Sequence, residues 1–270
     1  MQGAVALLDD LRAGKLALAF QPIMSLDEDG ERACLYSEAL LRRRQEENES
    51  SHAGPDAIET LERLGWIPRL DCSVVWTIVR LLERHPTQRI GCNVSALSIY
   101  DDAWWRALLA YLKENPSLAR RFTLEITETG FIGDLDEARG LIASLRATGV
   151  RIAVDDVSAD NRALELLSYL RADIAKIDRS VLRIDGSLSL PDPDLLPKLI
   201  TACAGYSPYV VVEGIENAIE LRAACRAGAQ GIQGFLIERP DLRPAWLQQA
   251  PAVVMDAYAC PSFAPEGRMR

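Results

Sequence analysis

The stretch Arg151-Ile-Ala-Val-Asp-Asp-Val157 decides how the chain folds. Three apolar residues run directly into two adjacent carboxylates, Asp155 and Asp156. Between helical segments, such a run is typical of a buried parallel strand whose carboxyl end opens at a site. Adjacent carboxylates repel one another unless a cation lies between them, and one or two divalent metals commonly fill that role. The alternative is structural: Asp155 ends the strand, and Asp156 caps a helix that begins near Asn161.

Strands and helices alternate along most of the chain. Two opening strands are expected at 16–23 and 33–41, and six more at 89–95, 122–128, 151–157, 174–178, 209–214 and 231–235. Helices are expected between them at 101–114, 134–148, 161–171, 193–204 and 217–227, with a closing helix at 244–257 interrupted at Pro251. Residues 43–55 form a polar loop, followed by helices at 55–64 and 68–84.

This alternation predicts a parallel α/β sheet, and eight strands in one domain point to a closed TIM (β/α)8-type barrel. The short turn between the first two strands predicts that they are antiparallel. A doubly wound open sheet is the alternative, but no G-x-G-x-x-G follows any strand. Residues 1–258 are expected to form this single domain and residues 259–270 a disordered tail.

The composition excludes several classes of function. The chain has 270 residues and a net charge of −9, which does not suit binding to a nucleic acid polymer. It has no apolar run long enough to span a membrane and no basic segment typical of a secretory signal. Six scattered cysteines without a C-x-x-C pair argue against a zinc site or a disulfide framework and favour a reducing, cytoplasmic compartment. With only two histidines, His52 and His85, catalysis is expected to rest on carboxylates and metal.

Polar residues gather where the predicted strands end. They are Gln21, Glu38, Asn93, Glu125, Glu128, Asp155, Asp156, Lys176, Asp178, Glu213 and Gln233. In a barrel these strand ends meet at one mouth, and unpaired carboxylates there would destabilise the fold unless cations compensate them. Each residue alone could instead cap a helix or form a turn. Carboxylate and amide ligands without His or Cys suit Mg²⁺ or Mn²⁺, and two such ions would support phosphoryl chemistry.

At these positions the chain resembles the EAL-domain family of cyclic di-GMP phosphodiesterases. The matching motifs, in family order, are Phe20-Gln21-Pro22-Ile23, Ser37-Glu38-Ala39-Leu40-Leu41-Arg42, Asn93-Val94-Ser95, Glu125-Ile126-Thr127-Glu128, Asp155-Asp156, Lys176-Ile177-Asp178, Glu213-Gly214-Ile215-Glu216 and Gln233-Gly234-Phe235. The resemblance covers roughly residues 7–240 and implies a modified barrel whose first strand is antiparallel. It also implies opening of cyclic di-GMP to linear pGpG with Mg²⁺ or Mn²⁺ at a two-metal site.

The resemblance assigns a role to each matching position. The implied metal ligands are Glu38, Asn93, Glu125, Asp155, Asp156 and Glu213, with Asp155 shared between two ions. Lys176 would hold the attacking water, and Gln233 would support the centre by hydrogen bonding. The implied substrate-binding residues are Gln21, Leu40, Arg42, Asp178 and Glu216, with Arg42 near a phosphate. Glu128 would be positioned by the loop after Asp156.

That loop departs from the family pattern D-D-F-G-T-G-x-S-S-L, because this chain reads D-D-V-S-A-D-N-R-A-L at 155–164. Two loop glycines are lost, and the family often dimerises near this region. Arg43 also stands where the family usually has tryptophan after the arginine. Three hypotheses therefore remain: an active phosphodiesterase, a weak or silent cyclic di-GMP receptor that acts through a protein partner or homodimer, and an interaction module without nucleotide. The intact ligand set favours the first, and the altered loop favours the second.

Overall fold

The computed structural model describes residues 2–26, 33–44, 50–52, 55–127, 134–158, 161–182, 194–247, 251–255 and 257. Its strands are β1 (Leu16–Ser25), β2 (Cys34–Arg44), β3 (Ser50–His52), β4 (Ile90–Ser95), β5 (Phe122–Thr127), β6 (Arg151–Val157), β7 (Ile174–Ile177), β8 (Val210–Val212), β9 (Gly231–Ile232) and β10 (Val253–Val254). The helices are α1 (Gln2–Arg12), α2 (Pro55–Arg63), α3 (Ile67–Arg84), α4 (Ala103–Glu114), α5 (Pro116–Ala119), α6 (Leu135–Thr148), α7 (Asn161–Leu170), α8 (Leu195–Ala204) and α9 (Ala218–Ala227). Three 3₁₀ turns are η1 (Ala96–Ser98), η2 (Arg179–Leu182) and η3 (Ala245–Leu247).

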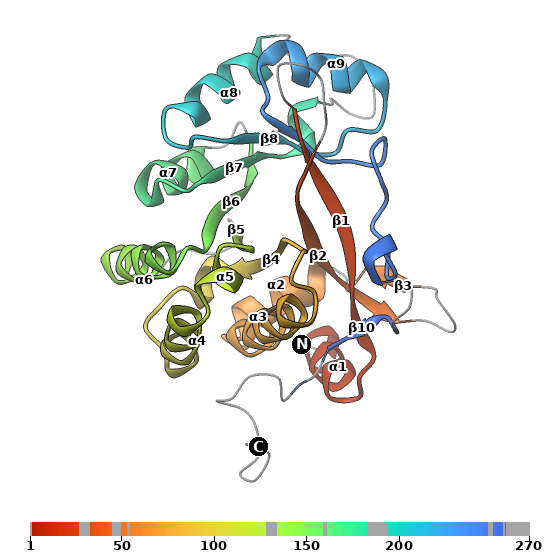
Figure 1. The fold of residues 1–270 in the computed structure, drawn as a ribbon, viewed down its shortest axis with the longest axis vertical. Helices are drawn as coiled ribbons and strands as arrows, with labels where there is room; N and C mark the ends of the chain where they lie inside the picture. Colours follow the sequence, from red (N-terminus) through yellow and green to blue (C-terminus); the bar gives the residue numbers. More distant parts are fainter. Residues whose placement is uncertain are drawn as a thin grey trace.

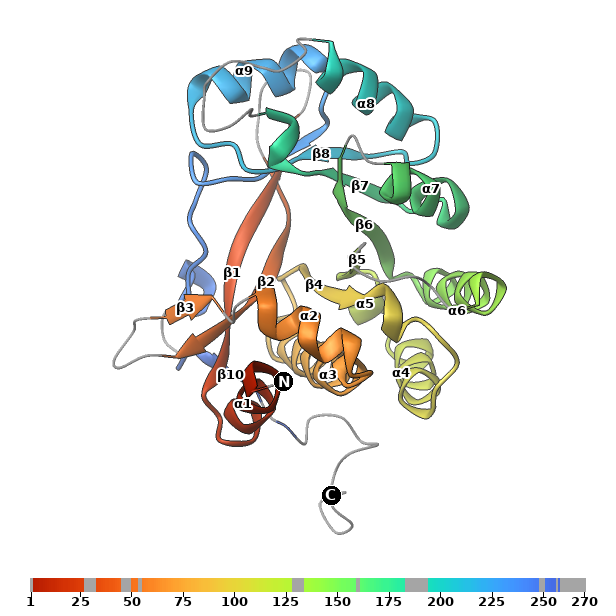
Figure 2. The same cartoon turned by 180° about the vertical axis from the view of Figure 1, so that it is seen from behind.

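Eight of the described strands close into a barrel. The sheet runs β1-β9-β8-β7-β6-β5-β4-β2, and pairing of β1 with β2 closes it. Neighbours from β2 through β4 to β9 pair in parallel, whereas β1 is antiparallel to both β2 and β9. The predicted barrel with a reversed first strand is therefore confirmed. Figures 1 and 2 show the later helices arranged outside the strands and the long β1–β2 pair crossing the molecule.

The helix ends follow local sequence signals. Asp134 accepts hydrogen bonds from the first-turn backbone N–H groups of α6, and Asn217 does the same for α9. Both helices end at a left-handed glycine, Gly149 after α6 and Gly228 after α9. Because these caps fix where each helix begins and ends, they also fix where the following strand enters the barrel.

The C-terminal part of the barrel departs from the predicted closing helix. Residues 244–257 instead contain the short turn η3 and the strand β10, which pairs with Ala17 and Leu18 of β1. The helix prediction was wrong because Pro251 breaks the segment, and the β-branched pair Val253–Val254 suits the free lower edge of β1. The predicted tail at 259–270 lies outside the described residues.

Two further expectations need correction. The polar segment after Leu41 is not all loop, since β2 continues to Arg44 and β3 pairs back onto it. Arg43 thereby points to α1, where its Nε lies 3.0 Å from an Asp10 carboxylate oxygen. Among the cysteines, Cys72 is disulfide-bonded, which the scattered spacing used to argue against a disulfide framework did not predict. Within the described residues, every helix is too short or too polar to cross a bilayer.

Candidate active site

The strand register gathers the predicted site residues into one layer inside the barrel. Side chains along a strand alternate between faces, so residues two apart point the same way. A lower interior layer contains Ile23, Tyr36, Ala153, Ile174 and Val211, which form one apolar cluster. Each of these five residues has a polar residue two positions away in the sequence, on the side toward the mouth. Strands β4 and β5 and the segment after β9 contribute three more polar residues. We call this set the site layer: Gln21, Glu38, Asn93, Glu125, Asp155, Lys176, Glu213 and Gln233.

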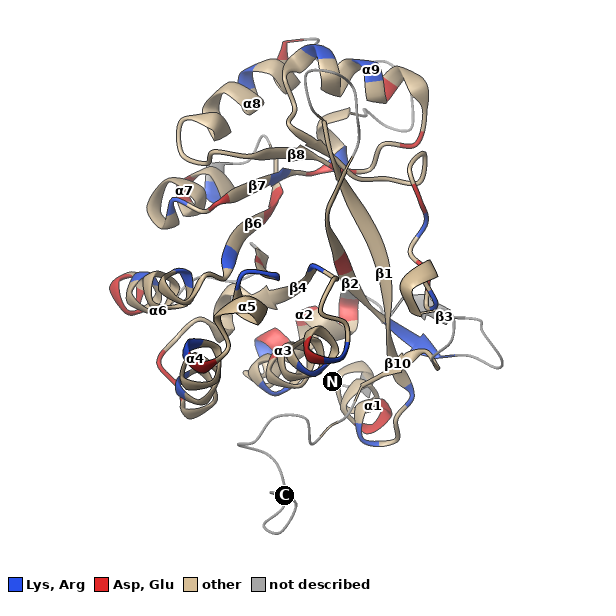
Figure 3. Cartoon of the chain, in the orientation of Figure 1, with Lys and Arg blue, Asp and Glu red and all other residues tan. Residues whose placement is uncertain are grey.

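Lys176 occupies the centre of the site layer. Its Nζ lies 3.2 Å from Glu38, 3.1 Å from Asp155 and 2.6 Å from Glu213, and it also forms an ion pair with Glu125. The lysine side chain has no solvent exposure. One ammonium group thus faces four carboxylates from β2, β5, β6 and the segment after β8. Figure 3 marks acidic segments on β2 and β6 and a basic segment on β7.

This imbalance shifts the pKa values of the cluster. Burial raises the pKa of Glu125 well above its usual value, and the nearby Glu38 charge adds to the shift. Burial and the charge of Asp155 do the same to the pKa of Glu213. Burial alone would lower the pKa of Lys176, but the surrounding carboxylates outweigh it and keep the lysine charged. The raised pKa values of Glu125 and Glu213 thus reflect an excess of carboxylates over ammonium groups, which a bound cation would relieve.

A bulge in β6 explains how adjacent carboxylates serve one site. Val154 pairs with Ala175 and Val157 with Ile177, so β6 contains one more residue than β7 across this interval. Asp156, within the bulge, has a φ of 57°, a left-handed conformation that is uncommon for residues other than glycine. In a regular strand Asp156 would point away from Asp155. Repulsion from Asp155 raises the pKa of Asp156 to about 7, so the two groups are in electrostatic contact.

The carboxylates form two overlapping groups of metal-ligand size. Oxygen atoms of Glu38, Glu125 and Asp155 lie within 4.8 Å of one another, and so do those of Asp155, Asp156 and Glu213. Asp155 belongs to both groups. These residues fit a pair of divalent cations bound by oxygen ligands, because the donor set contains carboxylates without His or Cys.

Asn93 strengthens this fit. Its amide nitrogen donates to Glu38 Oε1 at 2.6 Å, which turns the amide oxygen away from that carboxylate. That oxygen is buried and has no hydrogen-bond partner among the described residues. A buried acceptor without a donor destabilises a fold, and a cation bound beside it would remove the penalty.

Glu38 is held in place by donors from three parts of the barrel. Its second carboxylate oxygen accepts from Lys176 at 3.2 Å and from Gln233 Nε2 at 2.7 Å. The same Gln233 nitrogen lies 3.2 Å from Gln21 Oε1, and Gln21 donates to the Glu238 carbonyl at 2.9 Å. Burial would raise the pKa of Glu38, but the Lys176 charge and these donors lower it. Glu38 is therefore ionised and fixed in orientation.

A cavity of about 330 Å³ opens above the site layer. It is lined by Gln21, Glu38, Leu40, Asp155, Arg179, Glu213, Gly214, Glu216, Gln233, Gly234 and Phe235. Among the predicted substrate-binding residues, Gln21, Leu40 and Glu216 line this cavity. Arg42 does not; its guanidinium donates to the Leu41 carbonyl at 2.9 Å. Asp178 accepts from the Ser180 backbone at the start of η2, and Glu128 lies outside the described residues.

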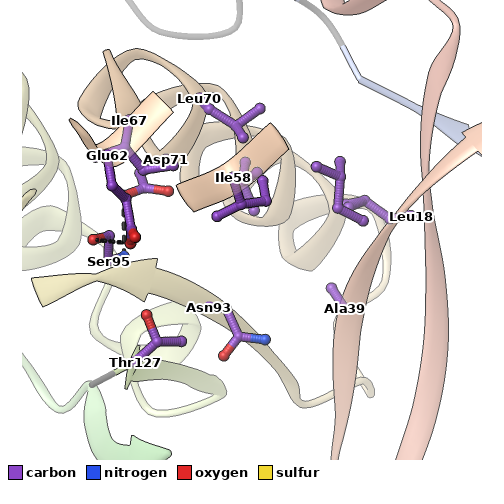
Figure 4. Close-up of a pocket in the computed structure, with 12 residues that line it drawn as sticks. Leu18, Ala39, Ile58, Glu62, Ile67, Leu70, Asp71, Asn93, Ser95 and Thr127 are labelled. Carbon is purple, nitrogen blue, oxygen red and sulfur yellow. Dashed lines mark hydrogen bonds between the residues drawn. The ribbon is translucent and has the colours of Figure 1, made fainter. Parts of the chain in front are cut away.

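A second cavity of about 160 Å³ lies beside Asn93, between β2, β4 and helices α2 and α3 (Figure 4). Asp71 and Glu62 point into it and were not predicted as site residues. Asp71 accepts from Ser95 N at 3.1 Å and Ser98 Oγ at 2.5 Å, and Glu62 accepts from Ser95 Oγ at 2.7 Å. Burial raises the pKa of Asp71 to about 7. Neither residue belongs to a motif used to predict the site, so only the packing of α2 and α3 against β4 reveals this acidic pair.

Comparison with known proteins places the chain in a family. The EAL domain family model matches residues 4–240. The chain belongs to the EAL domain family. It is 31% identical over 241 residues to the cyclic di-GMP phosphodiesterase NbdA of Pseudomonas aeruginosa, covering 85% of this chain and 29% of NbdA. The probable cyclic di-GMP phosphodiesterase PdeA of Escherichia coli is 26% identical over 246 residues, covering 88% of this chain and 32% of PdeA.

Solved structures share the fold of this EAL domain. The FimX EAL domain of Pseudomonas aeruginosa, bound to c-di-GMP, has a TM-score of 0.69 at 22% identity and covers 88% of this chain and 96% of that one. The Bacillus subtilis YkuI protein, in complex with c-di-GMP and calcium, has a TM-score of 0.66 at 24% identity and covers 91% of this chain and 61% of that one. The chain spans less than a third of the length of the curated relatives it matches.

Proposed function

We propose that this EAL domain is a metal-dependent phosphodiesterase that hydrolyses cyclic di-GMP to linear pGpG. The observation that carries the proposal is the pair of overlapping carboxylate groups joined by Asp155. That arrangement gathers more negative charge than Lys176 alone can balance, and a pair of divalent cations held there would suit displacement at phosphorus. Relatives named as cyclic di-GMP phosphodiesterases, and neighbours with c-di-GMP bound, supply the substrate class.

The proposed ligands of Mg²⁺ or Mn²⁺ are Glu38, Asn93, Glu125, Asp155, Asp156 and Glu213. When bound, such a metal pair would lower the pKa of a water molecule and neutralise charge that develops on the phosphate. Lys176 would donate hydrogen bonds to the attacking water, because its ammonium group already lies among the same carboxylates. Gln233 and Asn93 would keep the Glu38 carboxylate oriented throughout, since each already donates to one of its oxygens.

The two cavities suit different parts of the substrate. The cavity above the site layer combines polar groups with Leu40 and Phe235, an arrangement that suits a phosphate–sugar ring and an apolar base face. The second cavity has apolar walls and two carboxylates, Glu62 and Asp71. A guanine edge carries neighbouring N–H donors, which carboxylates accept well. We propose that one base enters the second cavity.

The test is incubation of the chain with cyclic di-GMP in Mg²⁺ and in Mn²⁺, with chromatography for pGpG. We expect product, and we expect the isosteric Glu38→Gln variant to form none although it folds. Binding in Ca²⁺ without turnover serves as the control for substrate capture. If the wild-type chain forms no pGpG in either metal, the enzymatic proposal is refuted.

A receptor function is the second candidate, and the altered segment 157–160 favours it. Val157 is fully buried in the apolar core, so phenylalanine, the family residue, does not fit there without repacking. A receptor would bind cyclic di-GMP tightly in Ca²⁺ while no pGpG accumulates over hours in Mg²⁺ or Mn²⁺. An interaction module would give no heat with the nucleotide under any metal condition.

A further inference from the structure

Arg179 lies at the mouth of the cavity above the site layer. Among the described residues that line this cavity it is the single cationic side chain, whereas Glu38, Asp155, Glu213 and Glu216 contribute four carboxylates. Arg179 directly follows Lys176-Ile177-Asp178 in sequence but, unlike those residues, matches none of the motifs used to predict the site. As the cationic residue among these carboxylates, Arg179 could bind a negatively charged group of a ligand, which the carboxylates cannot do.

The backbone fixes where Arg179 stands. It begins the 3₁₀ turn η2, and the Asp178 carboxylate caps that turn by accepting from Ser180 N at 2.8 Å. The aliphatic stem of Arg179 packs against Gly214, which has a φ of 67°. A Cβ atom at position 214 would overlap the Arg179 stem, so glycine is needed at that position to keep the arginine over the mouth.

The guanidinium itself is only loosely held. It lies 3.8 Å from Glu216, and the arginine side chain is 61% exposed. Ion pairs of this exposed kind contribute little to stability and open readily. Arg42 differs, because it is 8% exposed and donates to a carbonyl of its own strand. Of the two arginines, Arg179 is the one that lines this cavity.

A cyclic dinucleotide carries two phosphodiester groups, each with one negative charge. One must lie at the carboxylate cluster if it is to be cleaved, and the other then remains in an otherwise acidic cavity. Repulsion by Glu216 and its neighbours would weaken binding unless a cation meets that second charge. Arginine suits this task because its planar guanidinium donates in pairs to phosphate oxygens.

We propose that Arg179 binds the phosphodiester group of cyclic di-GMP that is not being cleaved, and that Glu216 holds the arginine at the mouth until substrate replaces it. This inference rests on the proposed function. Arg179 is thus a substrate-binding residue whose loss affects KM more than kcat. Glu216 competes with the substrate for the guanidinium, so neutralising it favours binding.

The experiment compares steady-state kinetics of Arg179→Ala, Arg179→Lys, Glu216→Gln and the control Arg226→Ala, which removes an exposed arginine from the outer helix α9. We expect Arg179→Ala to raise KM about tenfold, equivalent to about 1.4 kcal/mol, with kcat changed less than about threefold. Arg179→Lys should lie between wild type and alanine, and Glu216→Gln should lower KM. The dependence of KM on salt should weaken in Arg179→Ala but not in Arg226→Ala.

If the wild-type chain binds without turnover, the dissociation constant in Ca²⁺ replaces KM and the same order of variants is expected. Turnover or binding by Arg179→Ala that equals that of Arg226→Ala would overturn the role of Arg179 and leave the proposed function intact. A fall in kcat alone would also overturn it, because the arginine would then act in the chemical step. A wild-type chain that neither binds nor hydrolyses cyclic di-GMP would overturn both.

Discussion

Gly91 on β4 lies where a single added methyl group would disturb the site layer. A Cβ built on Gly91 would lie 2.5 Å from Tyr36 Cε2 and 2.6 Å from Glu125 Oε1. Carbon atoms in ordinary contact are about 3.5–4.0 Å apart, so Gly91→Ala must displace both groups, the Tyr36 ring by roughly 1 Å. Tyr36 and Glu125 have no solvent exposure, so neither is at the surface, where it could move aside freely.

Overpacking of this kind costs about 1–3 kcal/mol of unfolding free energy, which lowers the melting temperature by roughly 2–12 °C in a chain of this size. Mn²⁺ affinity should fall as well, because Glu125 is a proposed ligand of the metal. Urea unfolding followed by circular dichroism and calorimetric Mn²⁺ titration measure the two effects. Gly140→Ala on α6 is the matched control, since its Cβ would meet nothing within 4 Å.

The double variant Gly91→Ala/Tyr36→Leu separates the clash from general damage. Leucine removes the ring carbon that the new methyl group meets, so the double variant should be more stable than the sum of the single changes predicts, by more than about 1 kcal/mol. Tyr36→Phe keeps the same ring carbons and should give no such relief. Equal stability and equal Mn²⁺ affinity of Gly91→Ala and wild type would refute the proposed packing of Tyr36 and Gly91 beneath Glu125.

Three further outcomes follow from the charges of the site layer and of the second cavity. The pKa of Asp71 is raised from 3.8 to about 7 in the folded chain. Between pH 3.8 and about pH 7 the folded chain therefore keeps a proton that the unfolded chain has lost, and the free energy of unfolding falls as pH rises through this range. Asp71→Asn should therefore gain about 2–3 kcal/mol of unfolding free energy relative to wild type between pH 5 and pH 8 in paired urea titrations, and a constant difference would contradict this. Mn²⁺ binding should release protons and become tighter as pH rises, because the pKa values of Glu125 and Glu213 are raised. Calorimetry in buffers of different ionisation enthalpy would detect the proton release. If no protons are released, Glu125 and Glu213 are not ligands of the metal. Lys176→Met should abolish pGpG formation yet increase the Mn²⁺-induced rise in melting temperature, because four carboxylates lose their counter-ion. The control Lys198→Met, which changes an exposed lysine, should alter neither measurement. Full turnover in Lys176→Met would exclude the lysine from the mechanism.

The barrel and most of its site layer were predictable because both depend on simple periodicities. Alternating helices and strands gave the fold, and polar residues at strand ends gave Glu125, Asp155 and Lys176 as neighbours. Only one inward-facing position per strand lies at the depth of the site layer, so register alone brings these side chains together. The catalytic and metal-binding roles of these residues remain predictions.

Other features depend on geometry that residue patterns do not encode. The left-handed φ of Asp156 turns two adjacent carboxylates toward one site, and nothing in the letters Asp-Asp distinguishes this from a regular strand end. Arg42 follows the family motif, yet its side chain bonds to its own strand. Arg179 was not predicted, because its position over the cavity depends on a glycine 35 positions later in the chain. The strand β10 was mistaken for a helix because the free edge of β1 exists only in the folded barrel.

The hydrogen bonds from Gln233 to Gln21 and Glu38 join the end of the barrel to its beginning. During synthesis the ribosome delivers Glu38, Asn93, Glu125, Asp155 and Lys176 long before Gln233 emerges. A nascent chain that stops short of β9 therefore has most of the charged cluster but lacks one of the three donors that hold Glu38. Its first strand also lacks its partners β9 and β10. Formation of the complete site layer is in this way tied to synthesis of the chain through Gln233.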